Sequence, residues 1–214
     1  MIVVSLRITE IFLSVQGEAA SVGYPTVFVR LTGCPLRCHY CDSEYAFYGG
    51  DKHQIDAIVQ QVKDYRTLHV CVTGGEPLAQ PGCLKLMSDL CDLGLQVSIE
   101  TSGAMPIGDI DKRVSIVMDL KTPASGEVSR NLYENIAQLA PKDQIKFVIC
   151  DRQDYEWAVF KLDEYNLVKQ VGHVFFSPSF EQVTPVTLAD WILEGSLQVR
   201  LQPQLHKALW GDKP

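Results

Sequence analysis

Three cysteines lie close enough together in the sequence to bind the same metal centre. Cys34, Cys38 and Cys41 form a C-x3-C-x2-C pattern. Three thiolates on a short loop can reach three corners of a cubane cluster, which leaves the fourth iron without a protein ligand. Such an open iron can bind and activate a substrate, whereas an electron-transfer cluster normally takes four protein ligands. The pattern therefore predicts a catalytic 4Fe–4S cluster.

A glycine-rich segment supports this interpretation of the cysteines. Residues 73–77 read Thr-Gly-Gly-Glu-Pro and follow the next predicted strand. Gly74 and Gly75 allow the backbone to approach the amino and carboxylate ends of an amino-acid-like cofactor. The alternatives are a zinc site with His39 as fourth ligand, a chance grouping of cysteines, and a plain strand-to-helix turn. A structural zinc site has no need of the glycine segment, so the two motifs together favour the cluster.

The composition limits the function classes. The chain has 214 residues, of which 46% are hydrophobic, and this predicts a single domain over residues 1–214. The net charge of −7 argues against nucleic acid or an anionic membrane as partner. No uncharged apolar stretch of roughly 18 residues occurs, so we expect a protein that is neither secreted nor membrane-spanning. An odd number of cysteines, three of them clustered, fits metal binding in a reducing compartment and predicts a cytoplasmic protein.

The elements that position these residues alternate between strands and helices. Short apolar or β-branched runs predict strands over 7–14, 26–31, 69–73, 96–100, 114–120, 144–149, 173–176 and 197–201. Helical patterns cover 54–65, 82–93, 131–139, 154–165 and 187–193. This order predicts an α/β fold, a partial TIM-like barrel of parallel strands with outer helices and an extra N-terminal strand. About six or seven barrel strands are too few for a closed eight-fold barrel.

Polar residues that could take part in binding or catalysis follow the predicted strands at their carboxyl ends. Because these ends meet at one rim in a parallel sheet, we expect the residues to share a site. They are Cys34, the segment 73–77, the segment 100–103, Lys121, Ser177 and the segment 202–204.

The cysteine pattern combined with Thr-Gly-Gly-Glu-Pro resembles the radical S-adenosylmethionine (SAM) superfamily. The resemblance implies that the open iron chelates the methionine amino and carboxylate groups of SAM. The reduced cluster then breaks the sulfur–C5′ bond, and a 5′-deoxyadenosyl radical abstracts hydrogen from the substrate. Ser102, Lys121 and Ser177 have strand-end positions suited to the ribose, carboxylate and adenine of SAM. The cofactor-binding residues are then Gly74, Gly75, Glu76, Ser102, Lys121 and Ser177.

Further motifs resemble the 7-carboxy-7-deazaguanine synthase family over almost the whole chain. They are residues 10–18 (EIFLSVQGE), 28–34 (FVRLTGC), 41–43 (CDS), 99–103 (IETSG) and 204–207 (QLHK). This resemblance implies conversion of 6-carboxy-5,6,7,8-tetrahydropterin to 7-carboxy-7-deazaguanine with loss of ammonia, on the route to queuosine. SAM would act catalytically, and a flavodoxin-like electron donor and a homodimer are also implied.

The substrate's chemistry matches several polar residues. A pterin presents a donor-rich edge that needs carboxylate acceptors, and its own carboxylate needs cations or donors. The resemblance assigns the pterin pocket to Gln16, Glu18, Arg30, Thr73, Glu100, His206 and the terminal carboxylate of Pro214. The structural alternatives are a Glu18–Arg30 ion pair, a turn-capping role for Glu100 and a surface position for His206.

The resemblance also implies a magnesium ion that bridges the substrate carboxylate and the hydroxyl of Ser43. The family more usually has threonine at this position, and serine offers the same hard oxygen. Ala19 is a second departure, since a glycine commonly follows Gln-Gly-Glu in the family.

Two rival functions remain. A radical activase, which abstracts hydrogen from a glycine of a partner protein, would share the cysteine loop, but the glutamate-rich pocket argues against it. A non-enzymatic 4Fe–4S carrier or zinc protein would neither bind SAM nor form 5′-deoxyadenosine.

Overall fold

A computed structural model describes residues 5–180 and 182–211. Their strands form one sheet in the order β3-β1-β2-β4-β5-β6-β7-β8-β9. From β2 onward, with β3 excepted, neighbouring strands are parallel, whereas β1 pairs antiparallel with both β2 and β3. The strands are β1 (Ser5–Val15), β2 (Pro25–Leu31), β3 (Asp51–Gln54), β4 (His69–Gly74), β5 (Gln96–Thr101), β6 (Ser115–Asp119), β7 (Gln144–Ile149), β8 (His173–Pro178) and β9 (Arg200–Leu201).

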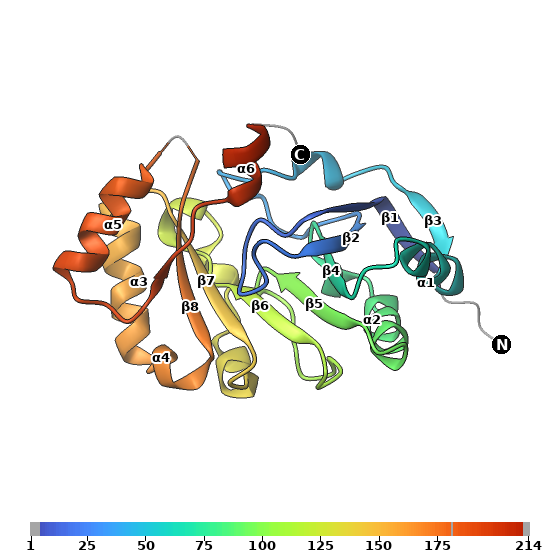
Figure 1. Ribbon diagram of the computed structural model, residues 1–214. Helices are drawn as coiled ribbons and strands as arrows, with labels where there is room; N and C mark the ends of the chain where they lie inside the picture. Colours follow the sequence, from blue (N-terminus) through green and yellow to red (C-terminus); the bar gives the residue numbers. More distant parts are fainter. Residues whose placement is uncertain (1–4, 181, 212–214) are drawn as a thin grey trace.

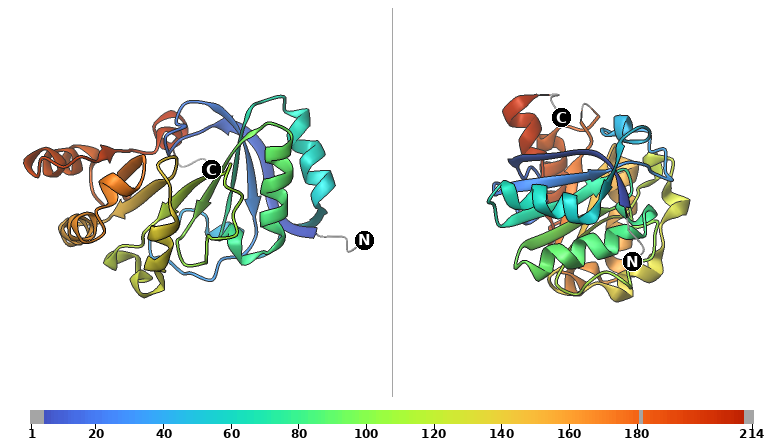
Figure 2. Two further views of the ribbon diagram at one scale, coloured as in Figure 1. Left: turned by 90° about the horizontal axis from the view of Figure 1, so that it is seen from below. Right: turned by 90° about the vertical axis from the view of Figure 1, so that its right-hand side faces the viewer.

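Helices cover the outer side of the curved sheet (Figures 1 and 2). They are α1 (Ile55–Asp64), α2 (Gly82–Asp92), α3 (Arg152–Glu164), α4 (Leu167–Gln170) and α5 (Pro185–Glu194). The short helix α6 (Leu205–Trp210) does not belong to this outer layer, because His206, Lys207 and Trp210 line the central cavity. The sheet stays open, with β3 and β9 as its two edges, so the predicted partial barrel with an extra N-terminal strand is confirmed. No helix within residues 5–180 and 182–211 has the length and hydropathy of a membrane-spanning segment.

The two faces of each barrel strand have different partners because side chains alternate along a strand. On β7, Ile145, Phe147 and Ile149 are buried in the hydrophobic core, and the Phe147 ring meets Trp157 of α3 edge to face. Lys146 and Val148 point to the opposite side, where they line a cavity. The same alternation lets every strand contribute apolar residues to the helices and polar residues to the inside of the barrel.

Most predicted elements are confirmed within one to three residues, but one helix prediction is wrong. Residues 131–139 contain a 3-10 helix over Tyr133–Gln138 instead of an α-helix, and another 3-10 helix over Val128–Arg130 precedes it. The Asn131 side chain bonds the backbone N–H and carbonyl of Lys121, and the Asn135 amide donates to the Gly103 and Met105 carbonyls. Asparagine side chains that bond backbone groups in this way compete with regular helix formation.

The other differences concern short elements. The last strand spans only Arg200–Leu201 of the predicted 197–201, because the Leu197 N–H bonds the Ile192 carbonyl and continues the end of α5. The edge strand β3 and the short helices α4 and α6 were not predicted, since none of them carries a clear hydrophobic period.

Three hydrogen bonds of glutamine side chains hold the loop of residues 16–20 against the last strands of the chain, through Gln144 at the start of β7 and Gln202 after β9. The Gln202 amide accepts from the Ala19 N–H at 2.7 Å and donates to the Ala19 carbonyl at 3.0 Å. Gln144 accepts from the Ala20 N–H at 2.7 Å. The loop is held with Ala19 at φ 62°, a left-handed conformation that favours glycine. The departure from glycine noted in the sequence therefore places a strained alanine beside Glu18.

We predict that Ala19→Gly raises the free energy of unfolding by about 0.5–1 kcal/mol, because glycine adopts this φ without steric cost. The matched control is Ala57→Gly on the exposed side of α1, which should lower stability by about 0.5–1 kcal/mol. Urea unfolding followed by circular dichroism measures both variants. A destabilised Ala19→Gly protein would show that the Ala19 methyl group contributes more by packing than it costs in strain.

Candidate active site

A cavity of about 750 Å³ lies at the carboxyl ends of the parallel strands. It brings together nearly all the site residues that the sequence predicts. These are Gln16, Glu18, Arg30, Cys34, Cys38, Cys41, Ser43, Thr73, Gly74, Gly75, Glu100, Ser102, Lys121, Ser177 and His206. Glu76 does not line this central cavity, and Pro214 lies outside the described residues.

The cysteine loop is fixed by backbone contacts with three other segments. The Gly33 N–H donates to the Ala46 carbonyl, and the Gly33 carbonyl accepts from the Glu76 N–H at 2.9 Å. Further along the loop, the His39 N–H donates to the Ser125 carbonyl at 3.0 Å, and the Arg37 N–H donates to Glu127 at 2.6 Å. The loop thus has a defined path before any metal is considered.

The cysteines do not form the compact ligand set of a zinc ion. Among residues 5–180 and 182–211, no three His, Cys, Asp or Glu side chains surround a single metal position. His39 Nδ1 lies 3.2 Å from the Ala124 carbonyl oxygen, and the His39 ring belongs to no such group within these residues. Three thiols that face one cavity from separate positions fit a cluster, in which each thiolate binds a different iron.

Burial raises the pKa of the Cys34 thiol, and it raises the pKa of Cys38 to about 11 against the opposing attraction of Lys121. Thiolates, not thiols, bind iron, so the metal itself must stabilise the anionic form. Cluster assembly at these positions therefore releases protons.

The glycine segment packs directly against the cysteine loop. A Cβ atom at Gly75 would collide with the Gly33 carbonyl group and the Cys34 Cβ, and one at Gly74 would collide with the Leu31 backbone. Gly74 also has φ 144°, which L side chains rarely adopt. The two glycines therefore permit β4 and the cysteine loop to pack backbone to backbone.

Glu76 is directed into a buried network between β4 and β5. Its carboxylate accepts from the Ser102 N–H at 2.7 Å, the Ser102 hydroxyl at 2.5 Å and the Thr101 hydroxyl at 2.9 Å. It also accepts from the Leu78 N–H at 3.0 Å. Glu76 thus fixes Ser102, which does line the cavity.

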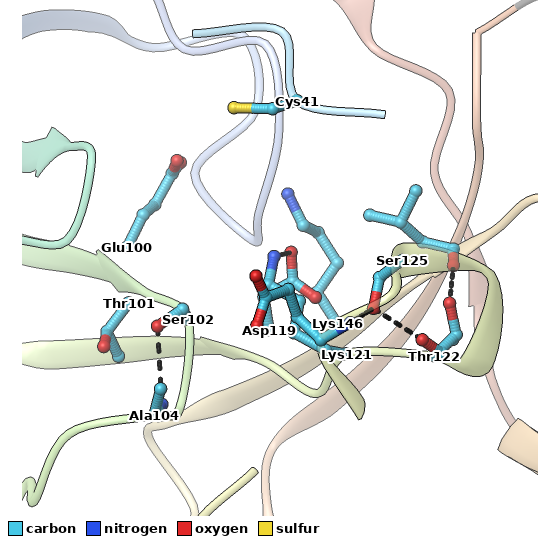
Figure 3. Close-up of polar contacts among 12 residues, drawn as sticks. Cys41, Glu100, Thr101, Ser102, Ala104, Asp119, Lys121, Thr122, Ser125 and Lys146 are labelled. Atoms are coloured by element: carbon cyan, nitrogen blue, oxygen red, sulfur yellow. Dashed lines mark hydrogen bonds and ion pairs between the residues drawn. The ribbon is translucent and has the colours of Figure 1, made fainter. Parts of the chain in front are cut away.

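The cysteine side of the cavity comprises the three cysteines, Gly74, Gly75, Ser102, Tyr40, Asp119, Lys121 and Ser177. Lys121 pairs with Asp119 at 2.9 Å, and both side chains are at most 15% exposed. Burial lowers the pKa of Lys121, but Asp119 and nearby thiols more than reverse this effect. Figure 3 shows this pair near Ser102 and below Cys41.

Three buried polar atoms on this side have no hydrogen-bond partner among the described residues. Within the described part of the chain, the buried side-chain atoms without a hydrogen-bond partner are Tyr40 Oη, Asp119 Oδ1 and Ser177 Oγ. All three residues line the central cavity. Buried polar groups are normally hydrogen-bonded. Their grouping beside the cysteine loop fits a ligand rich in hydroxyl and amino groups, such as SAM.

The glutamate side comprises Gln16, Glu18, Arg30, Thr73, Glu100, Lys146, Gln204 and His206. Glu18 accepts from Lys146 at 2.6 Å and from Gln204 at 2.8 Å. Burial alone would raise the pKa of Glu18, but Lys146, Gln204 and His206 lower it well below its usual range. Glu18 is thus held as an anion.

Glu100 lies in the same space without a cation of its own (Figure 3). Within the described residues its side chain forms no ion pair and accepts one hydrogen bond, from the Thr73 hydroxyl at 3.4 Å. Burial and the charge of Glu18 raise the pKa of Glu100, against the attraction of Lys146 and Arg30. The expected alternative, in which Glu100 caps the following turn, is wrong because Glu76 makes those contacts.

Arg30 pairs with Glu10, so the alternative Glu18–Arg30 ion pair is also wrong. The Nε atom of Arg30 donates to Glu10 at 2.7 Å, and Glu10 also accepts from the Tyr45 hydroxyl at 2.8 Å. The guanidinium lies 5.6 Å from the Tyr45 ring centroid and 5.8 Å from that of Phe12. Nε is therefore used by Glu10. Among the described residues the two terminal nitrogens of Arg30 donate no hydrogen bond, so they can bind a carboxylate ligand.

His206 lies against the 16–20 loop instead of on the open surface, since a Cβ at Gly17 would overlap its ring. Its neighbour Leu205 donates from its N–H to the Gly17 carbonyl at 3.0 Å. The Ser43 hydroxyl lies 3.8 Å from the Cys41 sulfur, beside Asp42, which accepts from Gln204 at 3.2 Å.

Lys146 and Asp119 are the principal residues that the sequence analysis did not single out. Each is a charged residue within an otherwise apolar strand, on the face that alternation turns toward the cavity. The two are paired across β6 and β7 in the sheet register. The signal was present, since a charge inside a buried strand needs a partner or a function.

The comparisons with known proteins agree with this geometry. Residues 28–122 match the radical SAM superfamily. The chain is 43% identical to the 7-carboxy-7-deazaguanine synthase of Koribacter versatilis, over 96% of this chain and 97% of that protein. It is 40% identical to the synthase of the same name from Chlorobaculum tepidum, over 96% and 94% of the two chains. In fold it is similar to the crystal structure of QueE from Escherichia coli, with a TM-score of 0.76, 22% identity and coverage of 94% and 95%.

We predict that Gly75→Ala displaces the cysteine loop, because the added methyl group collides with the Gly33 backbone and Cys34. The variant should keep its secondary structure but bind far less iron and sulfide after anaerobic reconstitution. Gly108→Ala is the matched control, since its methyl group would meet only the mobile end of Gln138. Full iron content in Gly75→Ala would contradict this role of the glycine.

Proposed function

The chain belongs to the 7-carboxy-7-deazaguanine synthase family of radical SAM enzymes, and on this basis we propose that its cavity binds 6-carboxy-5,6,7,8-tetrahydropterin beside SAM. As a radical SAM lyase, it uses a 4Fe–4S cluster and SAM. The reaction yields 7-carboxy-7-deazaguanine and ammonia, on the route to queuosine. The observation that supports this substrate most strongly is that two buried carboxylates, Glu18 and Glu100, line one cavity. The pKa of Glu18 is lowered and that of Glu100 is raised.

Cys34, Cys38 and Cys41 would hold the cluster, and the rest of the cysteine side would hold SAM. When bound and reduced there, such a cluster would supply the electron for reductive cleavage of SAM. Gly74 and Gly75 allow backbone contact with the cofactor, and Glu76 acts through Ser102. Lys121, held by Asp119, supplies a cation for a carboxylate, and Ser177 offers an unpaired hydroxyl.

The glutamate side would hold the pterin. Glu18 and Glu100 accept from the N–H groups of its guanidine-like edge, because a carboxylate is the natural acceptor for such donors. Thr73 and Gln16 add neutral hydrogen bonds, while the free guanidinium nitrogens of Arg30 bind the substrate carboxylate. His206 closes the pocket from α6. The carboxylate of Pro214 belongs to the same proposal but lies outside the described residues.

A magnesium ion would bind beside Ser43, between the serine hydroxyl and the substrate carboxylate. What supports this proposal is that Ser43 lines the cavity and offers a hard oxygen, the ligand type that magnesium prefers.

The remaining parts of the proposal come from the family resemblance. A flavodoxin-like protein would deliver the electron, the chain would act as a homodimer in the cytoplasm, and residues 1–214 would form a single domain. The continuous sheet supports the single domain, since its strand order spans the described chain from β1 to β9.

The direct test is anaerobic turnover. The reconstituted enzyme is supplied with a strong reductant, SAM and 6-carboxy-tetrahydropterin, and products are followed by chromatography with mass detection. We expect deazaguanine product without stoichiometric 5′-deoxyadenosine. Slow release of 5′-deoxyadenosine with no product would keep the radical chemistry and reject the substrate. Absence of both would reject the radical enzyme as well.

Two substitutions separate the two sides of the cavity. Cys38→Ala should abolish SAM cleavage because it removes a cluster ligand. Glu100→Gln should retain the cluster and should still cleave SAM slowly without substrate turnover. Its rate of product formation should fall about tenfold or more, as expected when a hydrogen bond to a charged group is lost. Iron content and the rates of both products measure the difference. Equal cluster loss in the two variants would contradict this division.

Magnesium dependence is a separate prediction. Ser43→Ala should lose the stimulation of product formation by magnesium, whereas Ser43→Thr should retain it, because threonine keeps the hydroxyl. Titration of magnesium into chelator-treated enzyme measures this response. Unchanged stimulation in Ser43→Ala would place the metal elsewhere.

A further inference from the structure

Lys146 is a cation on the glutamate side of the cavity that the proposed function does not use. Its ammonium group lies 2.6 Å from Glu18, and the two side chains are 14% and 11% exposed. Lys146 extends from the cavity face of β7, directly opposite Asp119 in the β6–β7 register. Figure 3 shows Lys146 in the same open space as Glu100 and Cys41.

The surroundings of Lys146 favour a fixed charge over a proton donor. Burial lowers the pKa of Lys146, but the nearby carboxylates Glu18, Asp119 and Glu100 raise it well above its ordinary value. A lysine so surrounded keeps its proton throughout the neutral range. Its effect must therefore be electrostatic, exerted on the groups that it contacts.

Glu18 is the group that depends on this charge. The charged or polar groups that face this space with it are Gln16, Arg30, Asp42, Thr73, Glu100, Gln204 and His206. Lys146 lowers the pKa of Glu18 most, His206 lowers it less, and Gln204 adds a neutral hydrogen bond at 2.8 Å, while the charge of Glu100 opposes ionisation of Glu18. A carboxylate in such a space takes up a proton when its cation is removed.

We propose that Lys146 is a positioning residue, a permanent cation that keeps Glu18 ionised and aimed at the donor edge of the bound substrate. One oxygen of Glu18 contacts Lys146, the other accepts from Gln204, and both keep lone pairs for a ligand. Glu18 thereby remains a charged acceptor while Glu100, which has no cation of its own, is the carboxylate that can change its protonation. This inference rests on the proposed pterin substrate.

The test is a double-mutant cycle in the reconstituted enzyme, with Lys146→Met, Glu18→Gln and the double variant. KM for 6-carboxy-tetrahydropterin should rise about tenfold or more in Lys146→Met, as expected for a weakened bond to a charged group. Iron content and uncoupled SAM cleavage should stay near wild type. In the Glu18→Gln background, Lys146→Met should cause little further rise, because the charge it supports is already gone.

The pH profile provides a readout that a purely structural lysine would not change. In Lys146→Met, Glu18 should take up a proton nearer neutrality, so KM should rise as pH falls from about pH 8.5 to about pH 6. The wild-type KM should rise less over this range, because the lowered pKa of Glu18 keeps it ionised.

Two lysine variants serve as controls. Lys121→Met removes the other buried lysine of the cavity and should raise the KM for SAM more than that for the pterin. Lys85→Met removes an exposed lysine paired with Asp89 on α2 and should change neither constant.

Each outcome decides the inference. Three results would overturn it. They are an unchanged KM in Lys146→Met, a pH profile of KM that does not change in this variant, and an equal rise in KM on Lys146→Met whether residue 18 is Glu or Gln. If Lys146→Met does not fold, the double variant decides, because removing both partners leaves neither Glu18 nor Lys146 as a buried charge without its partner. A double variant with the KM of Glu18→Gln supports the proposal, and a further rise overturns it. A wild-type enzyme that makes no deazaguanine would instead reject the proposed function, and this inference with it.

Discussion

A charge that is buried in a protein needs an opposite charge, and this requirement organises the central cavity. Two lysine–carboxylate pairs, Lys121–Asp119 and Lys146–Glu18, line this cavity. The desolvation cost of each charge is offset chiefly by its close partner. Each pair therefore fixes one part of the cavity, the first beside the cysteines and the second beside Glu100. The cavity thus has two differently charged sides, which can serve the two ligands of the proposed function.

The fold supplies this arrangement through strand alternation and close backbone packing. Apolar side chains of each strand pack against the outer helices, which leaves the inner face for polar groups. Gly74 and Gly75 bring the cysteine loop against the end of β4, and glutamine contacts hold the 16–20 loop so that Glu18 reaches Lys146. Residues far apart in sequence thereby meet in one space.

Local patterns allowed much of this to be predicted from the sequence. The cysteine spacing, the glycine segment and the apolar runs located the loop, the strands and the rim, because each depends on neighbouring residues. Contacts between distant segments could not be predicted in this way. The pairing of Arg30 with Glu10, the inward direction of Glu76 and the Lys146–Glu18 pair depend on how strands and loops meet. The 131–139 segment was misassigned because its asparagines bond backbone groups far along the chain.

We propose that one cavity holds both ligands, with the pterin against the Glu18–Lys146 pair. A crystal structure of the reconstituted enzyme with SAM and 6-carboxy-tetrahydropterin, grown without oxygen, tests this most directly. We expect pterin N–H groups within about 2.7–3.2 Å of the Glu18 and Glu100 carboxylates, with Lys146 still bound to Glu18. A pterin bound away from both carboxylates, or a Glu18 that has left Lys146, would contradict it.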